Sequence, residues 1–150
     1  MNKILLIEDD LNKIKQLQVF LDNNQNGFLK FELTVKKSYQ SGLESVLQGD
    51  YDLVLLDMSM HNFDKSVNET GGEFMQFAGE NILKEMVWNE IFFPVIIVTQ
   101  YDLIGNKSLD VLRQEWKNDY KKIYLGCVFY SANELNWKNE LLALIKIKLK

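Results

Sequence analysis

The sequence predicts an α/β fold built on a parallel sheet, and two observations lead to this. Short apolar runs alternate along the chain with longer segments whose apolar residues recur at helical spacing. Several of the runs are continuous rather than interrupted by polar residues, which is typical of strands buried on both faces of a sheet. Helices between such strands supply the right-handed crossovers that parallel pairing requires.

The first part of the chain contains three predicted strands and two helices. The first strand is a continuous apolar run, and Asp9 or Asp10 can cap the helix that follows it. The second strand alternates apolar and polar residues, which indicates one buried face. Ser38 opens the second helix, and Gly49 ends it. In chain order these elements are expected at residues 4–7, 11–21, 31–35, 38–49 and 53–56.

Residues 58–78 interrupt this rhythm as a long insertion loop that is polar at its centre and contains the pair Gly71-Gly72. A connection of this length within a compact domain is usually functional or disordered. Its apolar side chains could pack the loop onto the domain or form a partner surface, and both alternatives stay open. These side chains are Phe63, Phe74, Met75 and Phe77.

The alternation then resumes with a helix, a strand opened by Pro94, a helix, a strand and a closing helix. Trp88, Phe92 and Phe93 are expected in the core. Units of this kind predict a flavodoxin-like, doubly wound, five-stranded parallel sheet of order 2-1-3-4-5, with helices on both faces. We expect one domain over residues 1–150. The elements of this part are expected at residues 82–87, 94–99, 108–120, 123–130 and 137–149.

Composition narrows the range of functions. The net charge of -4 reflects no general excess of Lys and Arg, which argues against nucleic-acid binding. No apolar run approaches the roughly 20 residues of a membrane helix, and no signal-peptide pattern is present. Cys127 is the single cysteine, which excludes an internal disulfide and fits a reducing compartment. We therefore expect a cytoplasmic protein.

Acidic and hydroxyl side chains stand at the ends of three predicted strands. Glu8 and Asp9 follow the first strand, Asp57 ends the third, and Thr99 ends the fourth. Because the carboxyl ends of parallel strands meet in one crevice, these side chains should converge. Crowded carboxylates repel one another unless a cation intervenes. Their oxygens suit Mg²⁺, and an Asp beside such a metal is a competent nucleophile toward phosphorus.

Three runs in order make the chain similar to a response-regulator receiver domain of two-component signalling, the CheY-like family. The runs are Lys3-Ile-Leu-Leu-Ile-Glu8-Asp9-Asp10, Tyr51-Asp-Leu-Val-Leu-Leu-Asp57 and Pro94-Val-Ile-Ile-Val-Thr99. The resemblance covers essentially the whole chain apart from residues 58–78.

The resemblance implies a role for each residue at the strand ends. Asp57 would accept a phosphoryl group from a histidine kinase or phosphotransfer protein. Glu8 and Asp9 would hold Mg²⁺ together with Asp57 and the backbone carbonyl of Ser59. Thr99 would be the switch hydroxyl that moves toward the phosphoryl group.

The chain departs from the receiver pattern at three places, one of them the position of a switch-linked aromatic residue, which falls here on Cys127 or Val128. Receivers carry a lysine after the fifth strand, whereas this position falls here on Tyr130 or Ser131, and Lys138 comes too late in the chain. The residue after the switch hydroxyl is usually small, and here it is Gln100, which could narrow the pocket or donate a hydrogen bond. A missing lysine contact would slow phosphoryl transfer by about 10- to 100-fold.

Two further residues have open alternatives. Asp10 either joins the acidic site or caps the helix that follows it. His61 lies four residues after Asp57, and it is either an exposed loop residue or a proton donor or ligand at the crevice.

The leading hypothesis is a stand-alone receiver that acts by contacts with a downstream protein target, with at most self-phosphorylation and dephosphorylation chemistry. A homodimer is one form such contacts could take. The alternative is a degenerate receiver that serves as a phosphorylation-independent interaction module. A third alternative is a Mg²⁺-dependent phosphotransfer or nucleic-acid-cleaving enzyme on a similar sheet. The run Asp57-Met-Ser59 lacks the second Asp of an Asp-x-Asp motif, which counts against the nucleic-acid-cleaving alternative.

Overall fold

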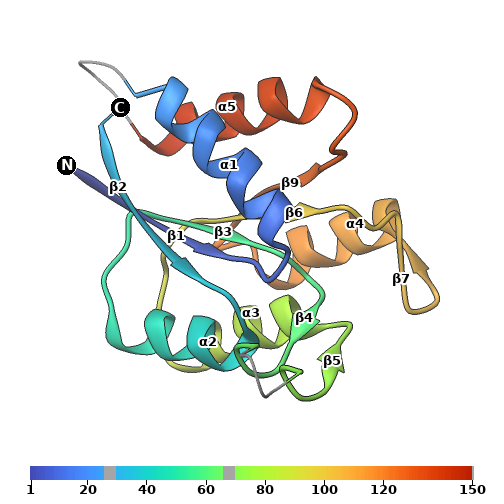
Figure 1. Ribbon diagram of the computed structural model, residues 1–150. Coiled ribbons are helices and arrows are strands. Elements are labelled where there is room, and N and C mark those ends of the chain that lie inside the picture. Colours follow the sequence, from blue (N-terminus) through green and yellow to red (C-terminus); the bar gives the residue numbers. More distant parts are fainter. Residues whose placement is uncertain (26–29, 66–69, 150) are drawn as a thin grey trace.

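The computed structural model describes residues 1–25, 30–65 and 70–149, and its central feature is a five-stranded parallel sheet (Figure 1). The strand order is β2-β1-β3-β6-β9, which is the predicted order 2-1-3-4-5 once strands outside this sheet are set aside. The flavodoxin-like fold expected from the sequence is therefore confirmed. The strands are β1 (Asn2–Ile7), β2 (Phe31–Lys36), β3 (Leu53–Leu56), β6 (Val95–Thr99) and β9 (Tyr124–Phe129).

Helices cover both faces of the sheet, as Figure 1 shows. One face carries α1 and α5, and the other carries α2, α3 and α4. Successive residues of a strand point to opposite faces, so Ile4 and Leu6 of β1 join the first layer while Leu5 and Ile7 join the second. The helices are α1 (Leu11–Asn23), α2 (Tyr39–Gln48), α3 (Ala78–Trp88), α4 (Leu109–Asp119) and α5 (Asn136–Lys148).

The segment between β3 and α3 has regular structure near both of its ends. β4 (Met60–His61) pairs antiparallel with β5 (Phe74–Met75), and Met60 lies opposite Met75. Residues 66–69 of the predicted insertion loop lie outside the described residues. The expectation of an irregular loop is therefore corrected for these ends, because Met60 is fully buried and anchors the ribbon in the core.

A second small ribbon follows β6. It consists of β7 (Leu103–Ile104) and β8 (Lys107–Ser108), which pair antiparallel across a turn. Gly105 has φ +62° in this turn, a conformation that side-chain-bearing residues rarely adopt. Ser108 then caps α4 by accepting a hydrogen bond from Val111 N.

The expected core placement is wrong for Trp88 and Phe92, whose exposed fractions are 85% and 49%. Trp88 is the last residue of α3 and falls outside the buried stripe that contains Met86. Phe93 is partly buried and packs edge-on against Tyr51 at 5.9 Å between ring centroids. No helix in the described part of the chain is long and apolar enough to cross a membrane.

Candidate functional site

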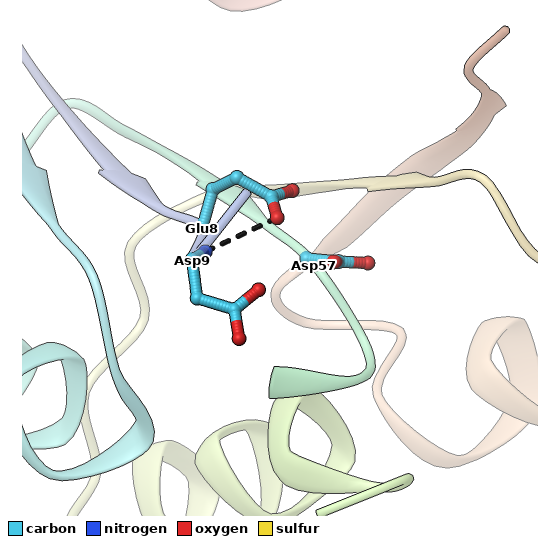
Figure 2. Close-up of side chains that lie close together, drawn as sticks. All are labelled: Glu8, Asp9 and Asp57. Carbon is cyan, nitrogen blue, oxygen red and sulfur yellow. Dashed lines mark hydrogen bonds between the residues drawn. The ribbon is translucent and has the colours of Figure 1, made fainter. Parts of the chain in front are cut away.

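Three carboxylates meet at the carboxyl ends of β1 and β3. Glu8 and Asp9 directly follow β1, and Asp57 directly follows β3, as Figure 2 shows. The register that places Ile7 beside Leu56 brings them together, and one oxygen of each lies within 4.8 Å of the others. The structure thus brings the three acids together as the sequence predicts.

Each carboxylate is oriented by backbone N–H groups. Glu8 Oε2 accepts hydrogen bonds from Asp9 N, drawn in Figure 2, and from Asp10 N, both at 3.1 Å. Asp57 Oδ1 accepts one from Met58 N at 2.7 Å. Glu8 and Asp57 are almost fully buried, with exposed fractions of 1% and 2%. Burial of acids is costly without a compensating partner, so their charge must be balanced locally.

Lys13, from the first turn of α1, provides such a partner. Glu8 Oε1 forms an ion pair with Lys13 Nζ at 2.5 Å. Asp57 Oδ2 lies 3.5 Å from the same ammonium. Nζ also donates to the carbonyl of Val98 at 2.7 Å and to Oε1 of Gln100 at 3.1 Å. The buried lysine is therefore held on several sides.

Burial and charge act in opposite directions on the pKa values of these groups. Burial, helped by the charge of Asp57 and opposed by Lys13, raises the pKa of Glu8 to about 8. Burial also raises the pKa of Asp57, although Lys13 opposes this. Burial lowers the pKa of Lys13, but Asp57 and Glu8 outweigh it and the net pKa is raised. Lys13 is therefore a cation at neutral pH.

His61, one of the two open cases from the sequence, reaches the crevice through Asp9. Its backbone N–H and its Nδ1 both lie within hydrogen-bond distance of Asp9 Oδ2, at 3.0 and 2.9 Å. The ring also packs edge-on against Phe74 of β5 at 5.1 Å between ring centroids. Ribbon β4–β5 therefore positions a partner for the most exposed of the three acids.

The donor set suits a hard divalent cation. The three carboxylates of Glu8, Asp9 and Asp57 offer oxygen atoms, and oxygen is the ligand atom that Mg²⁺ prefers. The hydroxyl of Ser59 donates to the carbonyl of Gln76 at 2.7 Å, and the ligand role of the Ser59 backbone carbonyl stays a prediction. Asp10 caps α1, because its side chain accepts hydrogen bonds from Asn12 N and Lys13 N. Of its two alternatives, the structure shows the helix cap.

The β6 and β9 side of the crevice holds the remaining predicted residues. Thr99 is fully buried, and its hydroxyl accepts a hydrogen bond from Tyr101 N at 3.2 Å. Tyr130 follows β9 and hydrogen-bonds to the carbonyl of Thr99 through its backbone N–H at 2.7 Å. Its ring lies beneath Lys13, with Nζ 5.5 Å from the ring centroid. An aromatic ring thus stands at one of the two positions, Tyr130 and Ser131, on which the lysine of receivers was expected to fall.

Sequence reasoning missed Lys13, although a signal for it exists. Lys13 is four residues before Leu17, so it lies on the buried stripe of α1 rather than on its polar face. It also stands in the first turn of the helix, where the dipole disfavours a cation. A lysine on an apolar stripe close to an acidic pair indicates a buried ion pair.

Comparisons with known proteins agree with this fold. No protein-family model matches the chain. Along 146 residues the chain is 28% identical to the Detocs response regulatory protein DtcB of Enterobacter cloacae, covering 93% of this chain and 95% of that protein.

Solved receiver structures share the fold. The receiver domain of the Francisella response regulator 1452 matches with TM-score 0.66 and 20% identity, over 98% of this chain and 95% of that one. TrrA of Thermotoga maritima, solved in complex with Mg²⁺-BeF, matches with TM-score 0.59 and 19% identity, over 96% of this chain and 99% of that one. The chain therefore has the fold of CheY-like response-regulator receiver domains, without a lysine directly after the last strand of the sheet.

Proposed function

We propose that this receiver domain accepts a phosphoryl group on Asp57 in a Mg²⁺-dependent reaction and signals through protein contacts. The observation that carries the proposal is the cluster of Glu8, Asp9 and Asp57 at one edge of the sheet, in which Glu8 and Asp57 are buried. The solved complex of TrrA with Mg²⁺-BeF, a protein of the same fold, supports the choice of metal. The expected cytoplasmic location and the single domain over residues 1–150 form part of the same proposal.

In the proposed step, a carboxylate oxygen of Asp57 forms a new bond to phosphorus. The bond between phosphorus and the donor breaks, and the donor atom keeps the electron pair. That atom is a ring nitrogen when the donor is a phosphohistidine and a carboxylate oxygen when it is acetyl phosphate. Mg²⁺ held by Glu8, Asp9, Asp57 and the Ser59 carbonyl would offset charge on the transferred group. Thr99 is the proposed switch hydroxyl.

We propose that the phosphoryl donor is a histidine kinase or a phosphotransfer protein. A downstream protein would then bind this chain and respond to the signal. The resemblance to the response regulatory protein DtcB along nearly the whole chain supports a signalling role.

A second candidate is a degenerate receiver that binds partners without being phosphorylated. The observation that favours it is the ion pair between Lys13 and the acids Glu8 and Asp57, which already balances part of their charge. In this case Asp57 would have a structural role only.

Incubation with acetyl phosphate and Mg²⁺, followed by intact-protein mass spectrometry, separates the two candidates. We expect a mass increase of one phosphoryl group that chelation of Mg²⁺ prevents. Asp57→Asn should abolish the increase. Asp52→Asn is the matched control, because Asp52 precedes the same strand at its other end, and it should label like wild type. The phospho-acceptor role is refuted if the wild-type protein stays unlabelled, or if Asp57→Asn is labelled as well as wild type.

A further inference from the structure

Two residues at the places where the chain departs from the receiver pattern, Tyr130 and Gln100, contact the same side chain. Gln100 Oε1 accepts a hydrogen bond from Lys13 Nζ at 3.1 Å, and the Tyr130 ring lies under that ammonium at 5.5 Å from its centroid. We propose that Lys13 of α1 supplies the fixed positive charge of the phospho-acceptor site, replacing a lysine after β9. This inference rests on the proposed function of Asp57.

The position of the ammonium suits this role. Nζ lies 3.5 Å from Asp57 Oδ2, the carboxylate that would carry the phosphoryl group. Phosphorylation adds negative charge at that carboxylate, next to a side chain that is 1% exposed. Water screens a buried pair weakly, so a cation at this distance stabilises added anionic charge more than an exposed lysine does.

Three acceptors keep the ammonium in place before any phosphoryl group arrives. The carbonyl of Val98 at 2.7 Å and Gln100 Oε1 at 3.1 Å lie on β6 and just after it, and Glu8 Oε1 forms the third contact. An ammonium has three protons, and these acceptors match that number. Gln100 is in this scheme a positioning residue, which explains why a long polar side chain follows Thr99.

Tyr130 completes the arrangement from the β9 side. Its hydroxyl donates to Gln16 Oε1 of α1 at 2.7 Å, which ties the end of β9 to the helix that carries Lys13. The ring face is itself attractive to a cation.

Beryllofluoride, a stable mimic of the phosphoryl group, tests the proposal with Mg²⁺ present and tryptophan fluorescence or calorimetry as the readout. Lys13→Met should weaken beryllofluoride binding by about 10- to 100-fold, the value of a charge-assisted contact. The affinity for Mg²⁺ alone should not fall, because Lys13 is not a metal ligand and competes for Glu8 and Asp57. Lys15→Met is the control, since Lys15 is exposed on the same helix, and it should bind like wild type.

The outcomes separate this inference from the proposed function. Equal beryllofluoride affinity in Lys13→Met and wild type overturns the role of Lys13 and leaves Asp57 as acceptor. If the wild-type protein neither binds beryllofluoride nor is labelled by acetyl phosphate, the role of Lys13 and the role of Asp57 are both overturned. If Lys13→Met does not fold, Gln100→Ala decides, because it loosens Lys13 without removing its charge. Gln100→Ala should weaken beryllofluoride binding by about 2- to 10-fold, and unchanged binding contradicts the proposal.

Discussion

The two sides of the crevice differ in how they follow the receiver pattern. On the side of β1 and β3, Glu8, Asp9 and Asp57 stand where the pattern expects acids. On the side of β9, the expected lysine is absent, and Tyr130 and Ser131 follow the strand in its place. The positions of the three acids are fixed by the register of β1 and β3. The position of the cation that balances their charge is not fixed by strand register.

A cation can reach the acids from any element close to the edge. Lys13 does so from α1, because its long stem spans from the helix to Glu8 and Asp57 while its ammonium stays over the Tyr130 ring. The comparison therefore teaches that a missing lysine at one strand end does not mean a missing charge. The variants below test each side in turn.

The largest effect is expected for Lys13→Ala in the absence of divalent metal. The change leaves Glu8 and Asp57 buried without their cation, which should lower the free energy of unfolding by about 3–5 kcal/mol. Urea denaturation measures this loss. Saturating Mg²⁺ should reduce it, because the metal takes over the neutralisation. Lys107→Ala is the control, since its pair with Glu115 is solvent-exposed and should leave stability unchanged. If Lys13→Ala is as stable as wild type, Lys13 does not balance the charge of Glu8 and Asp57 in the crevice.

The sheet could be predicted because its strands carry a local signal. The run at 53–56 is continuous and apolar, and β3 spans Leu53–Leu56. The convergence of Glu8, Asp9 and Asp57 then follows from the strand order, since these acids come directly after neighbouring strands.

The position of Lys13 could not be predicted in the same way. Its partners Val98 and Gln100 lie 85 and 87 residues further along the chain, and the Val98 partner is a backbone carbonyl that leaves no trace in the sequence. Periodicity treats lysine as a surface residue, although a paired lysine can be buried. Trp88 was expected in the core because its side chain is large and apolar. Its position at the end of α3 instead leaves it exposed.

On the acidic side, a smaller effect is expected for His61→Ala. The ring holds Asp9 Oδ2 at 2.9 Å, and such outer partners orient metal-binding carboxylates. Mg²⁺ affinity measured by calorimetry should fall about 10-fold, the lower end for such partners, because the backbone N–H of His61 still holds Asp9. Phe63→Ala, which removes an exposed ring near the same ribbon, should bind Mg²⁺ like wild type. Unchanged affinity in His61→Ala would show that Asp9 is oriented without the ring.

On the β9 side, Tyr130→Phe should have the smallest effect. It removes the hydrogen bond from the hydroxyl to Gln16 Oε1 and keeps the ring beneath Lys13. Unfolding free energy should fall by about 0.5–1.5 kcal/mol, and a double-mutant cycle with Gln16→Ala should assign that loss to the pair. Beryllofluoride affinity should stay at the wild-type value, because the charge of Lys13 is untouched. If the affinity instead falls as far as in Lys13→Met, the hydroxyl rather than the ammonium serves the phosphoryl group, and the β9 side is then the active half of the crevice.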